Sequence, residues 1–470
     1  MAALFISAAH KSSGKTTISM GLCAALRQRG LNVQPFKKGP DYIDPMWLGA
    51  AAGHACHNLD FNTMGMKELK TLYNSFHNTA DIAIIEGNKG LYDGLDIEGR
   101  NSNAALARLL KVPVILVIDT NGMTRGIAPL ILGYQAFDKR VRIVGVILNK
   151  VGGRRHEGKL RAVLEHYTDV PVVGAVHEHA ELRIDERHLG LIPSNEAAAA
   201  ARKIAAIGAQ VGAQVDMELL LTIARSAPNI NQPKIKLPAP KNSHKVRLGV
   251  AKDSAFGFYY AGDFDALRQA GAELVFFDTL HDKQLPVVDG LFIGGGFPET
   301  HAAALEANVS LRHDIKTAID KGLPVYAECG GLMYLSRSLA WKDQVYTMVG
   351  AVPADTVMHE RPQGRGYIRL RETGASPWAL RDSERNDVEI CAHEFHYSSL
   401  ENVATDVRYA YDVLRGHGID GKRDGIIYKN VLGGYAHMRD VAANPWAARF
   451  VEFVARCAEG KHTSQMRATG

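Results

Sequence analysis

The stretch "LPVYAECGGLMYLS", residues 323–336, places one cysteine between a short apolar strand pattern and the start of a helix. Cys329 stands at the joint, with Glu328 before it and two glycines after it. A sharp strand-to-helix turn exposes its central side chain and needs small neighbours, here Ala327 and the two glycines. The helix N-terminus then lowers the pKa of the thiol. We therefore predict that Cys329 is a nucleophile. The alternative is an inert cysteine in a core.

A glycine cluster, "FIGGGFPE" (292–299), ends an earlier apolar strand pattern. Backbone N–H groups in such a loop can stabilise the oxyanion that forms when a nucleophile attacks an amide or ester carbonyl. We predict that Gly295 and Gly296, together with Gly330, form this oxyanion hole.

A general base for the thiol must come from a distant part of the chain. "HEFHYS" (393–398) contains His393 and His396, and "GGYAHMRD" (433–440) contains His437. The residues alone leave all three histidines as candidates.

The first half of the chain contains another loop between a strand pattern and a helix pattern, "AAHKSSGKTT" (8–17). It meets the pattern G-x-x-x-x-G-K-[ST] at Gly14, Lys15 and Thr16, with Ala9 in place of the first glycine. Backbone N–H groups and the helix dipole point at phosphates in such a loop, which predicts an ATP site. The alternative is a turn of small residues with a solvated lysine. The predicted ATP-binding residues are Ser13, Gly14, Lys15, Thr16, Thr17 and Asn149.

Polar side chains end the following strand patterns. Glu86, Asp119 and Asn149 each stand at the carboxyl end of an apolar run, where parallel sheets gather their ligands. Glu86 is a predicted Mg²⁺ ligand, and the Asn149 amide could read a purine edge. Each of these residues could instead cap a strand end.

The loop "PFKKGPDYIDP" (35–45) carries both charge signs between prolines. A rigid loop of this kind suits holding a carboxylate and a metal together. We predict that Lys37, Asp41 and Tyr42 bind an acceptor carboxylate, while Asp44 joins the metal site. The predicted metal ligands are Thr16, Asp44 and Glu86. The alternative is a solvated charged turn.

Short apolar strand patterns alternate with helical patterns through most of the chain, which predicts the α/β class with two doubly wound domains built on parallel sheets. A proline-rich polar segment separates the two series. We predict a first domain at 1–225, a linker at 226–245, a second domain at 246–460 and a disordered tail at 461–470.

Composition excludes several classes of function. The 470 residues are 46% hydrophobic and 22% charged, with a net charge of +5 and no basic run with interleaved aromatics, so we expect no nucleic-acid partner. Five cysteines without metal-binding spacing suggest a reducing compartment. No apolar run is long enough to span a membrane and the N-terminus has no signal-peptide pattern, so we expect a cytoplasmic protein.

The motifs carry two family resemblances. The first half resembles the dethiobiotin synthetase-type P-loop domain. More closely, "FKKGPDYIDP" (36–45), "NLD" (58–60), "GLYDG" (90–94) and "RHLGL" (187–191) resemble the cobyrinic acid a,c-diamide synthase family. The order of a cysteine elbow and a distant histidine resembles the class I glutamine amidotransferases. The resemblance covers nearly the whole chain.

The resemblance implies roles for the second half. It favours His437 as the general base of Cys329 and places Glu394 in the glutamine pocket. In class I amidotransferases a glutamate commonly stands two residues after the histidine, but here that residue is Arg439. The diamide synthase family shares this departure and is thought to use a Cys–His dyad.

The implied activity is amidation of the a and c acetate carboxylates of cobyrinic acid or hydrogenobyrinic acid, with ATP, Mg²⁺ and glutamine, through an acyl phosphate. Asn88 and Lys89 depart from the small or apolar residues usual in the family, which keeps siroheme or a related sirohydrochlorin open as the acceptor. Rival classes are a non-catalytic P-loop partner ATPase and a binding protein with an inactive amidotransferase half. A homodimer is also left open.

Overall fold

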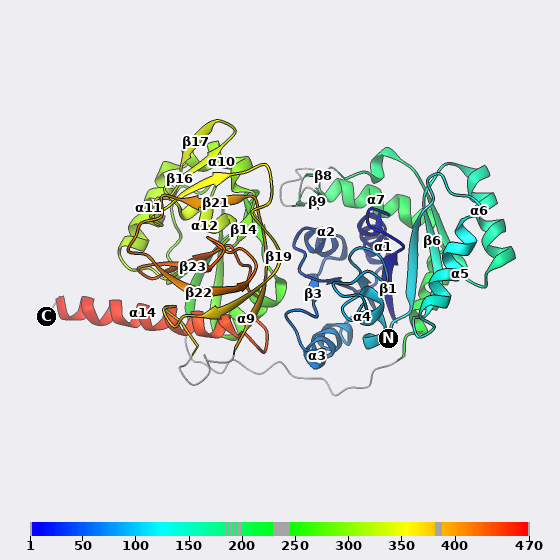
Figure 1. The fold of residues 1–470 in the computed structure, drawn as a ribbon, viewed down its shortest axis with the longest axis horizontal. Helices are drawn as coiled ribbons and strands as arrows, with labels where there is room; N and C mark the ends of the chain where they lie inside the picture. Colours follow the sequence, from blue (N-terminus) through cyan, green and yellow to red (C-terminus); the bar gives the residue numbers. More distant parts are fainter. Residues whose placement is uncertain are drawn as a thin grey trace. The chain divides into compact units, whose positions relative to one another are not determined.

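The structure is a computed structural model that describes residues 2–184, 186–187, 190–191, 193–194, 200–228, 245–380 and 388–468, with backbone alone at 186–187, 190–191 and 461–468. The chain divides into two units, Met1–Ile235 and Lys236–Gly470, which are treated separately (Figure 1). The predicted linker, 226–245, lies almost wholly outside the described residues, and so does part of the "RHLGL" stretch.

The first unit is a parallel sheet covered by helices. Its elements are β1 (Ala2–Ala8), α1 (Lys15–Gln28), β2 (Val33–Lys38), α2 (Ile43–Ala52), β3 (His57–Leu59), α3 (Met66–His77), β4 (Ile82–Glu86), α4 (Asn103–Leu110), β5 (Val114–Asp119), α5 (Ile127–Phe137), β6 (Ile143–Val151), α6 (Arg154–Tyr167), β7 (Val172–His177), η1 (Ala180–Leu182), β8 (Glu186–Arg187), β9 (Gly190–Leu191), α7 (Ala200–Gln214) and α8 (Met217–Arg225).

Among the described residues, the order of the main sheet is β3-β2-β4-β1-β5-β6-β7, and every pair of neighbours is parallel. The central strands β1 and β4 are buried along their whole length, as expected for strands that are apolar on both faces. Helices α1, α2 and α7 pack together on one side of the sheet, and α5 and α6 lie on the other (Figure 1). This arrangement brings the carboxyl ends of β1, β2 and β4 to one edge.

The second unit has an α/β half and a strand-rich half. Its elements are β10 (Val246–Ala251), β11 (Phe256–Phe258), α9 (Ala261–Gln269), β12 (Ala272–Phe277), β13 (Gly290–Ile293), β14 (Gly295–Gly296), η2 (Pro298–His301), α10 (Ala302–Ala307), α11 (Val309–Asp320), β15 (Val325–Glu328), α12 (Gly330–Leu335), β16 (Ser338–Trp341), β17 (Gln344–Thr347), β18 (Asp355–Met358), β19 (Gly364–Glu372), β20 (Ile390–His396), β21 (Ser398–Glu401), β22 (Arg408–Arg415), β23 (Arg423–Tyr428), β24 (Val431–Gly434) and α14 (Trp446–Ala468).

The predicted α/β class with two wound sheets is confirmed, with an addition in the second unit. Its larger sheet has the order β12-β10-β13-β15-β24-β23-β22-β19-β20 in the described residues. The strands from β12 to β24 are parallel, and the remaining pairs are antiparallel. The sequence analysis did not foresee this antiparallel half, because strands of alternating burial such as β19 and β20 give a weaker signal than fully apolar strands.

Helix α14 differs from the sequence prediction at its end. The sequence predicts a disordered tail over 461–470, whereas the helix runs to Ala468. The first turns of the helix are anchored in the core, and 459–468 contain no proline, so extending the helix costs little once it has begun. Residues 469–470 lie outside the described residues.

In the described part of the chain, no helix combines the length and the apolar character needed to cross a bilayer.

An aromatic cluster forms the core beneath α14. Phe450 is fully buried, and its ring centroid lies 4.8 Å from Trp378, 6.1 Å from Tyr326 and 6.3 Å from Trp446. The side chain therefore joins the C-terminal helix to the strand that ends at the predicted nucleophile.

We expect Phe450→Ala to lower the free energy of unfolding of the second unit by about 3–5 kcal/mol, because it leaves a cavity in a packed core. Urea unfolding followed by tryptophan fluorescence measures this change. Val309→Ala, at an exposed position, should change the free energy by no more than about 0.5 kcal/mol. A loss no larger for Phe450→Ala than for this control would contradict the packing.

Candidate active site

The backbone at Cys329 makes the sharp turn that the sequence predicts. Cys329 has φ 46° and ψ −102°, a strained conformation for a residue with a side chain. Its N–H donates to the Gly434 carbonyl at 2.7 Å, and its carbonyl accepts from the Met333 N–H at 3.0 Å. The turn is thus fixed between the end of β15 and the first turn of α12.

The glycines around the turn permit close backbone contacts. A Cβ on Gly331 would lie 2.1 Å from the Ile293 carbonyl oxygen, and one on Gly296 would lie 1.9 Å from that of Ala255. A Cβ on Gly330 would lie 3.0 Å from the Gly296 nitrogen. The predicted oxyanion-hole glycines therefore meet beside the thiol, although their role in binding an oxyanion stays a prediction.

His437 lies against the same glycine loop. A Cβ on Gly295 would be 2.5 Å from Cε1 of the His437 imidazole and 3.4 Å from Nε2, so the absence of a side chain at 295 makes room for the ring. The ring is almost fully buried. The structure thus places His437 against the glycine loop, and Gly296 of this loop packs against Gly330, next to Cys329.

The other two candidate histidines are less suited to act as a base. His393 pairs with His437 through backbone hydrogen bonds, and burial, together with the repulsion that the nearby His437 ring would exert when protonated, lowers the pKa of His393 to about 3. The His396 ring stacks on Tyr435 with centroids 3.8 Å apart, and its Nδ1 lies 2.7 Å from the Ser398 carbonyl oxygen. The geometry therefore favours His437.

The structure corrects the predicted acidity of the thiol. Burial raises the pKa of Cys329, and the negative charges of Glu299 and Glu328 add to this rise. The Gly330 N–H, which hydrogen-bonds to the sulfur, opposes it without compensating. The prediction of a lowered thiol pKa is therefore wrong for the ligand-free protein. The cost of removing the thiolate from water outweighs the stabilisation that the N-terminus of the six-residue helix α12 gives to it.

Glu328 was quoted in the sequence analysis without a role, yet its carboxylate lies 3.5 Å from Nδ1 of His437. The sequence signal that could have indicated this role is a charged residue at the end of a buried strand. Glu394, by contrast, accepts hydrogen bonds from the backbone N–H groups of His417 and Gly418, both at 2.8 Å. The contacts of Glu394 fix a turn, and its role in the glutamine pocket stays a prediction.

In the first unit, the loop 8–17 enters α1 as the pattern requires. Gly14 has φ 80° and precedes the helix, and Thr16 and Thr17 lie in its first turn. Asn149 donates from Nδ2 to the Ser13 carbonyl at 2.9 Å. A Cβ on Gly14 would lie 2.2 Å from this amide. Asn149 thus holds the loop in shape, and its reading of a purine stays a prediction.

The predicted metal ligands cluster around a lysine. Lys37 Nζ lies 2.5 Å from Asp44 Oδ2 and 2.5 Å from Glu86 Oε1, and the Thr16 hydroxyl donates to the same Glu86 oxygen at 3.0 Å. The second oxygen of Glu86 is buried and has no hydrogen-bond partner among the described residues. An anionic group of this kind fits a cation with oxygen ligands. Among the described residues, however, no cluster of three His, Cys, Asp or Glu has metal-binding geometry.

The remaining predicted residues of this unit surround that cluster. Asp41 accepts from the backbone N–H of Ile43 and Asp44 and so caps α2, and its other oxygen is 3.8 Å from Lys37. Tyr42 is buried just before the helix. Burial lowers the pKa of Lys15 to about 8, although Glu86 opposes the shift. The site is therefore desolvated, with an ammonium group ready for an anion.

Asn103 was missed by the sequence analysis. Its side chain is fully buried and donates to the Gly90 carbonyl at 2.8 Å and to the Ser7 hydroxyl at 3.3 Å. The Leu91 N–H in turn donates to the Ala8 carbonyl at 2.8 Å. The "GLYDG" loop is thereby fastened to the phosphate loop. An asparagine at a helix start gives no sequence signal for this contact.

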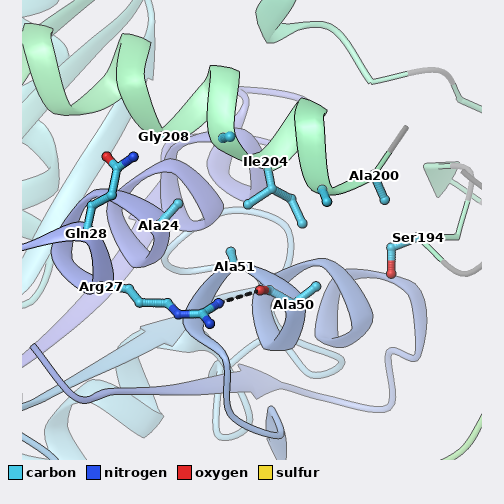
Figure 2. Close-up of a pocket in the computed structure, with 11 residues that line it drawn as sticks. Ala24, Arg27, Gln28, Ala50, Ala51, Ser194, Ala200, Ile204 and Gly208 are labelled. Atoms are coloured by element: carbon cyan, nitrogen blue, oxygen red, sulfur yellow. Dashed lines mark hydrogen bonds between the residues drawn. The ribbon is translucent and has the colours of Figure 1, made fainter. Parts of the chain in front are cut away.

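A cavity of about 540 Å³ lies away from this chemistry. Figure 2 shows Ala200, Ile204 and Gly208 of α7 on one side and Arg27 and Ala51 on the other. Its lining residue Ala24 is about 13 Å along α1 from Lys15. The neighbouring segment 195–199 lies outside the described residues, so we assign the cavity no role.

The chain matches two protein-family models. Residues 5–192 match the CobQ/CobB/MinD/ParA nucleotide binding domain, and residues 247–444 match the CobB/CobQ-like glutamine amidotransferase domain. The two matches correspond to the two units, and each contains the loop that the sequence analysis singled out.

Curated relatives are similar over nearly the whole chain. The cobyrinate a,c-diamide synthase of Magnetococcus marinus is 47% identical over 455 residues, which cover 96% of each chain. Its counterpart in Methanosarcina acetivorans is 42% identical over 96% of this chain and 94% of the relative. That of Archaeoglobus fulgidus is 42% identical over 93% of this chain and 94% of the relative.

We expect Gly331→Ala to destabilise the second unit by about 1–3 kcal/mol, because the added methyl forces the Ile293 carbonyl to move. Gly262→Ala is a matched control in α9, where a Cβ meets open space and alanine favours the helix. Urea unfolding should show a loss for the first variant and no loss for the second. Equal stability of the two variants would contradict the tight packing at the turn.

Proposed function

Because this chain belongs to the cobyrinate a,c-diamide synthase family, we propose that it converts the a and c acetate carboxylates of cobyrinic acid into amides, using ATP and glutamine. The chain is a glutamine-dependent amidoligase. The observation that carries the proposal is that one chain contains both a strained cysteine turn beside a buried histidine and a phosphate loop beside buried carboxylates.

The second unit would release ammonia from glutamine. The Cys329 thiol gives its proton to His437 Nε2, and the thiolate attacks the amide carbon. The backbone N–H groups of Gly296 and Gly330 would stabilise the oxyanion. His437 returns the proton to the leaving ammonia as the carbon–nitrogen bond breaks, which leaves a glutamyl thioester that water hydrolyses. Burial raises the pKa of this thiol, so the reaction needs a base that takes its proton.

The first unit would activate the acceptor carboxylate. An unactivated carboxylate does not react with ammonia, so its oxygen first attacks the γ-phosphorus of ATP, and ADP leaves. Lys15 and the N–H groups of the loop stabilise charge on the transferred phosphoryl group. Ammonia then attacks the acyl carbon of the acyl phosphate, and phosphate leaves.

The cluster at β2 and β4 would hold Mg²⁺, which when bound would neutralise charge on the phosphates. Thr16, Asp44 and Glu86 supply the oxygens, and the buried, unpaired Glu86 Oε2 supports this assignment. Lys37 pairs with both carboxylates in the ligand-free protein and would turn to the acceptor carboxylate, assisted by Asp41 and Tyr42.

The environment of Asn88 supports a second candidate for the acceptor substrate. Its side-chain oxygen accepts from Lys38 Nζ at 3.1 Å, so this departure from the family pattern fixes a lysine near the predicted acceptor site. A siroheme-type tetrapyrrole, with a different arrangement of carboxylates, is therefore the alternative substrate.

Amidation is tested by mass spectrometry of cobyrinic acid and siroheme incubated with the protein, ATP, Mg²⁺ and glutamine. We expect cobyrinic acid to lose mass in two steps as two hydroxyls are replaced by amino groups. Cys329→Ser should abolish the reaction with glutamine but keep it with ammonium, while Lys15→Met should abolish both. Cys391→Ser is a matched cysteine control that should keep both. The proposal fails if wild-type protein amidates neither tetrapyrrole.

The affinity for ATP should fall as pH rises through about 8. The pKa of Lys15 is lowered to about 8, and ATP favours the charged ammonium, so the loss should approach tenfold per pH unit above that value. Isothermal titration calorimetry at several pH values between neutral pH and about 9.5 measures how the affinity for ATP changes with pH. Lys15→Arg stays charged and should show a flatter dependence. An equally steep slope in both proteins would contradict this assignment.

A further inference from the structure

We propose that Glu328 is the positioning residue of the thiol site: its carboxylate orients the His437 imidazole and stabilises the imidazolium formed when the thiol loses its proton. The inference rests on the proposed glutamine hydrolysis. Glu328 would take the role of the glutamate that class I amidotransferases commonly have two residues after the histidine, where this chain has Arg439.

The carboxylate faces the ring nitrogen that points away from the glycine loop. Glu328 Oε2 is 3.5 Å from His437 Nδ1, while Cε1 and Nε2 of the ring face Gly295. This separation is longer than a hydrogen bond but within ion-pair distance, and contacts of this kind commonly tighten when substrate binds.

The other carboxylate oxygen is held by two donors. The Tyr326 hydroxyl donates to Glu328 Oε1 at 2.7 Å, and the Met438 N–H donates to it at 2.9 Å. Met438 directly follows His437. The carboxylate is therefore fixed to the backbone next to the histidine, and its free oxygen is aimed at the ring.

The sheet explains why this residue can act on a histidine more than 100 positions away. β15 and β24 are parallel neighbours, with Glu328 opposite Gly434. His437 follows three residues beyond Gly434, so both side chains emerge at the carboxyl edge of the sheet. The Cys329 N–H bonded to the Gly434 carbonyl locks the register.

The other carboxylates near the site have different hydrogen-bond partners. Asp424 accepts from the N–H groups of Tyr435 and Ala436, and Asp263 accepts from the Asp440 N–H. Other titratable groups near the pair are Glu299, whose charge acts on the thiol, His393, which is neutral, and Arg439. The Glu328 carboxylate lies within ion-pair distance of the His437 ring.

Arg439 cannot replace it. Arg439 stands where a class I amidotransferase commonly has its glutamate, but its guanidinium lies 4.7 Å from the centre of the Tyr260 ring. A cation cannot accept the Nδ1 proton of an imidazole. Glu328, at the end of the strand before the nucleophile, therefore provides the hydrogen-bond acceptor for the His437 Nδ1 proton.

The proposed role of Glu328 is to control the protons on the His437 ring. With the Nδ1 proton directed at Glu328, Nε2 keeps its lone pair and takes the proton of the Cys329 thiol. The imidazolium then carries a positive charge in a buried site, and the carboxylate compensates it. The proton passes from Nε2 to ammonia as the glutamine carbon–nitrogen bond breaks.

Glu328→Gln is the decisive variant, because glutamine has the same shape and can still accept from Tyr326 and Met438. It loses the charge and presents an amide N–H to the histidine. We expect kcat for glutamine hydrolysis to fall by a factor of about 100 or more, by analogy with an aspartate-to-asparagine change beside a catalytic histidine. The acid limb of the kcat/KM profile should move to lower pH, because the imidazolium loses its counter-charge.

Two further variants separate positioning from folding. Glu328→Asp keeps the charge and should recover part of kcat, with the acid limb near that of the wild type. Glu372→Gln changes a buried carboxylate that accepts from the Leu380 N–H and pairs with Arg449, and it should leave kcat and the pH profile unchanged. Amidation with ammonium should persist in Glu328→Gln, which demonstrates that the first unit is intact.

The inference is overturned if Glu328→Gln hydrolyses glutamine within about threefold of wild type with an unmoved acid limb. It is also overturned if Glu328→Asp is as impaired as Glu328→Gln in both rate and profile. Failure of the wild type to release glutamate in the complete reaction would overturn the proposed function itself, and the two failures are thereby distinguished.

Discussion

The left-handed backbone at Cys329 is the constraint on which the second unit depends. A φ of 46° at a residue with a side chain costs about 1–3 kcal/mol, and the turn persists because hydrogen bonds to Gly434 and Met333 and the packing of Gly331 on Ile293 leave no alternative. This requirement explains the glycines of the neighbouring loop. The thiol in this turn is buried and its pKa is raised, so a base beside it is necessary.

Both units keep charged groups away from water by pairing them. In the first unit Lys37 pairs with Asp44 and Glu86, and in the second the Glu328 carboxylate lies against His437. A buried ion left without its partner costs several kcal/mol, so these groups are either paired or ready to receive a charged ligand. The same physical condition therefore stabilises the ligand-free protein and prepares each site for its substrate.

Parallel strands provide the edge at which each site is assembled. Lys37 and Glu86 come from the ends of β2 and β4, and Glu328 and His437 come from the ends of β15 and β24. Residues far apart in sequence meet because neighbouring parallel strands deliver their carboxyl ends to one place. The sequence analysis applied this rule to Glu86, Asp119 and Asn149, and it assigned Thr16 and Asp44 to the metal site from their loops. The structure does bring Thr16, Asp44 and Glu86 together.

The sequence by itself determined the features that depend on a few adjacent residues: the glycine before α1, the turn at Cys329, and the α/β class read from apolar runs. Only the tertiary structure decided which histidine lies beside the glycine loop, that Asn149 holds the phosphate loop, and that Glu328 faces His437. It also reversed the expected acidity of the thiol. The physical reason is that local backbone geometry follows from neighbours in the chain, whereas burial and contacts across a sheet depend on segments more than a hundred residues apart.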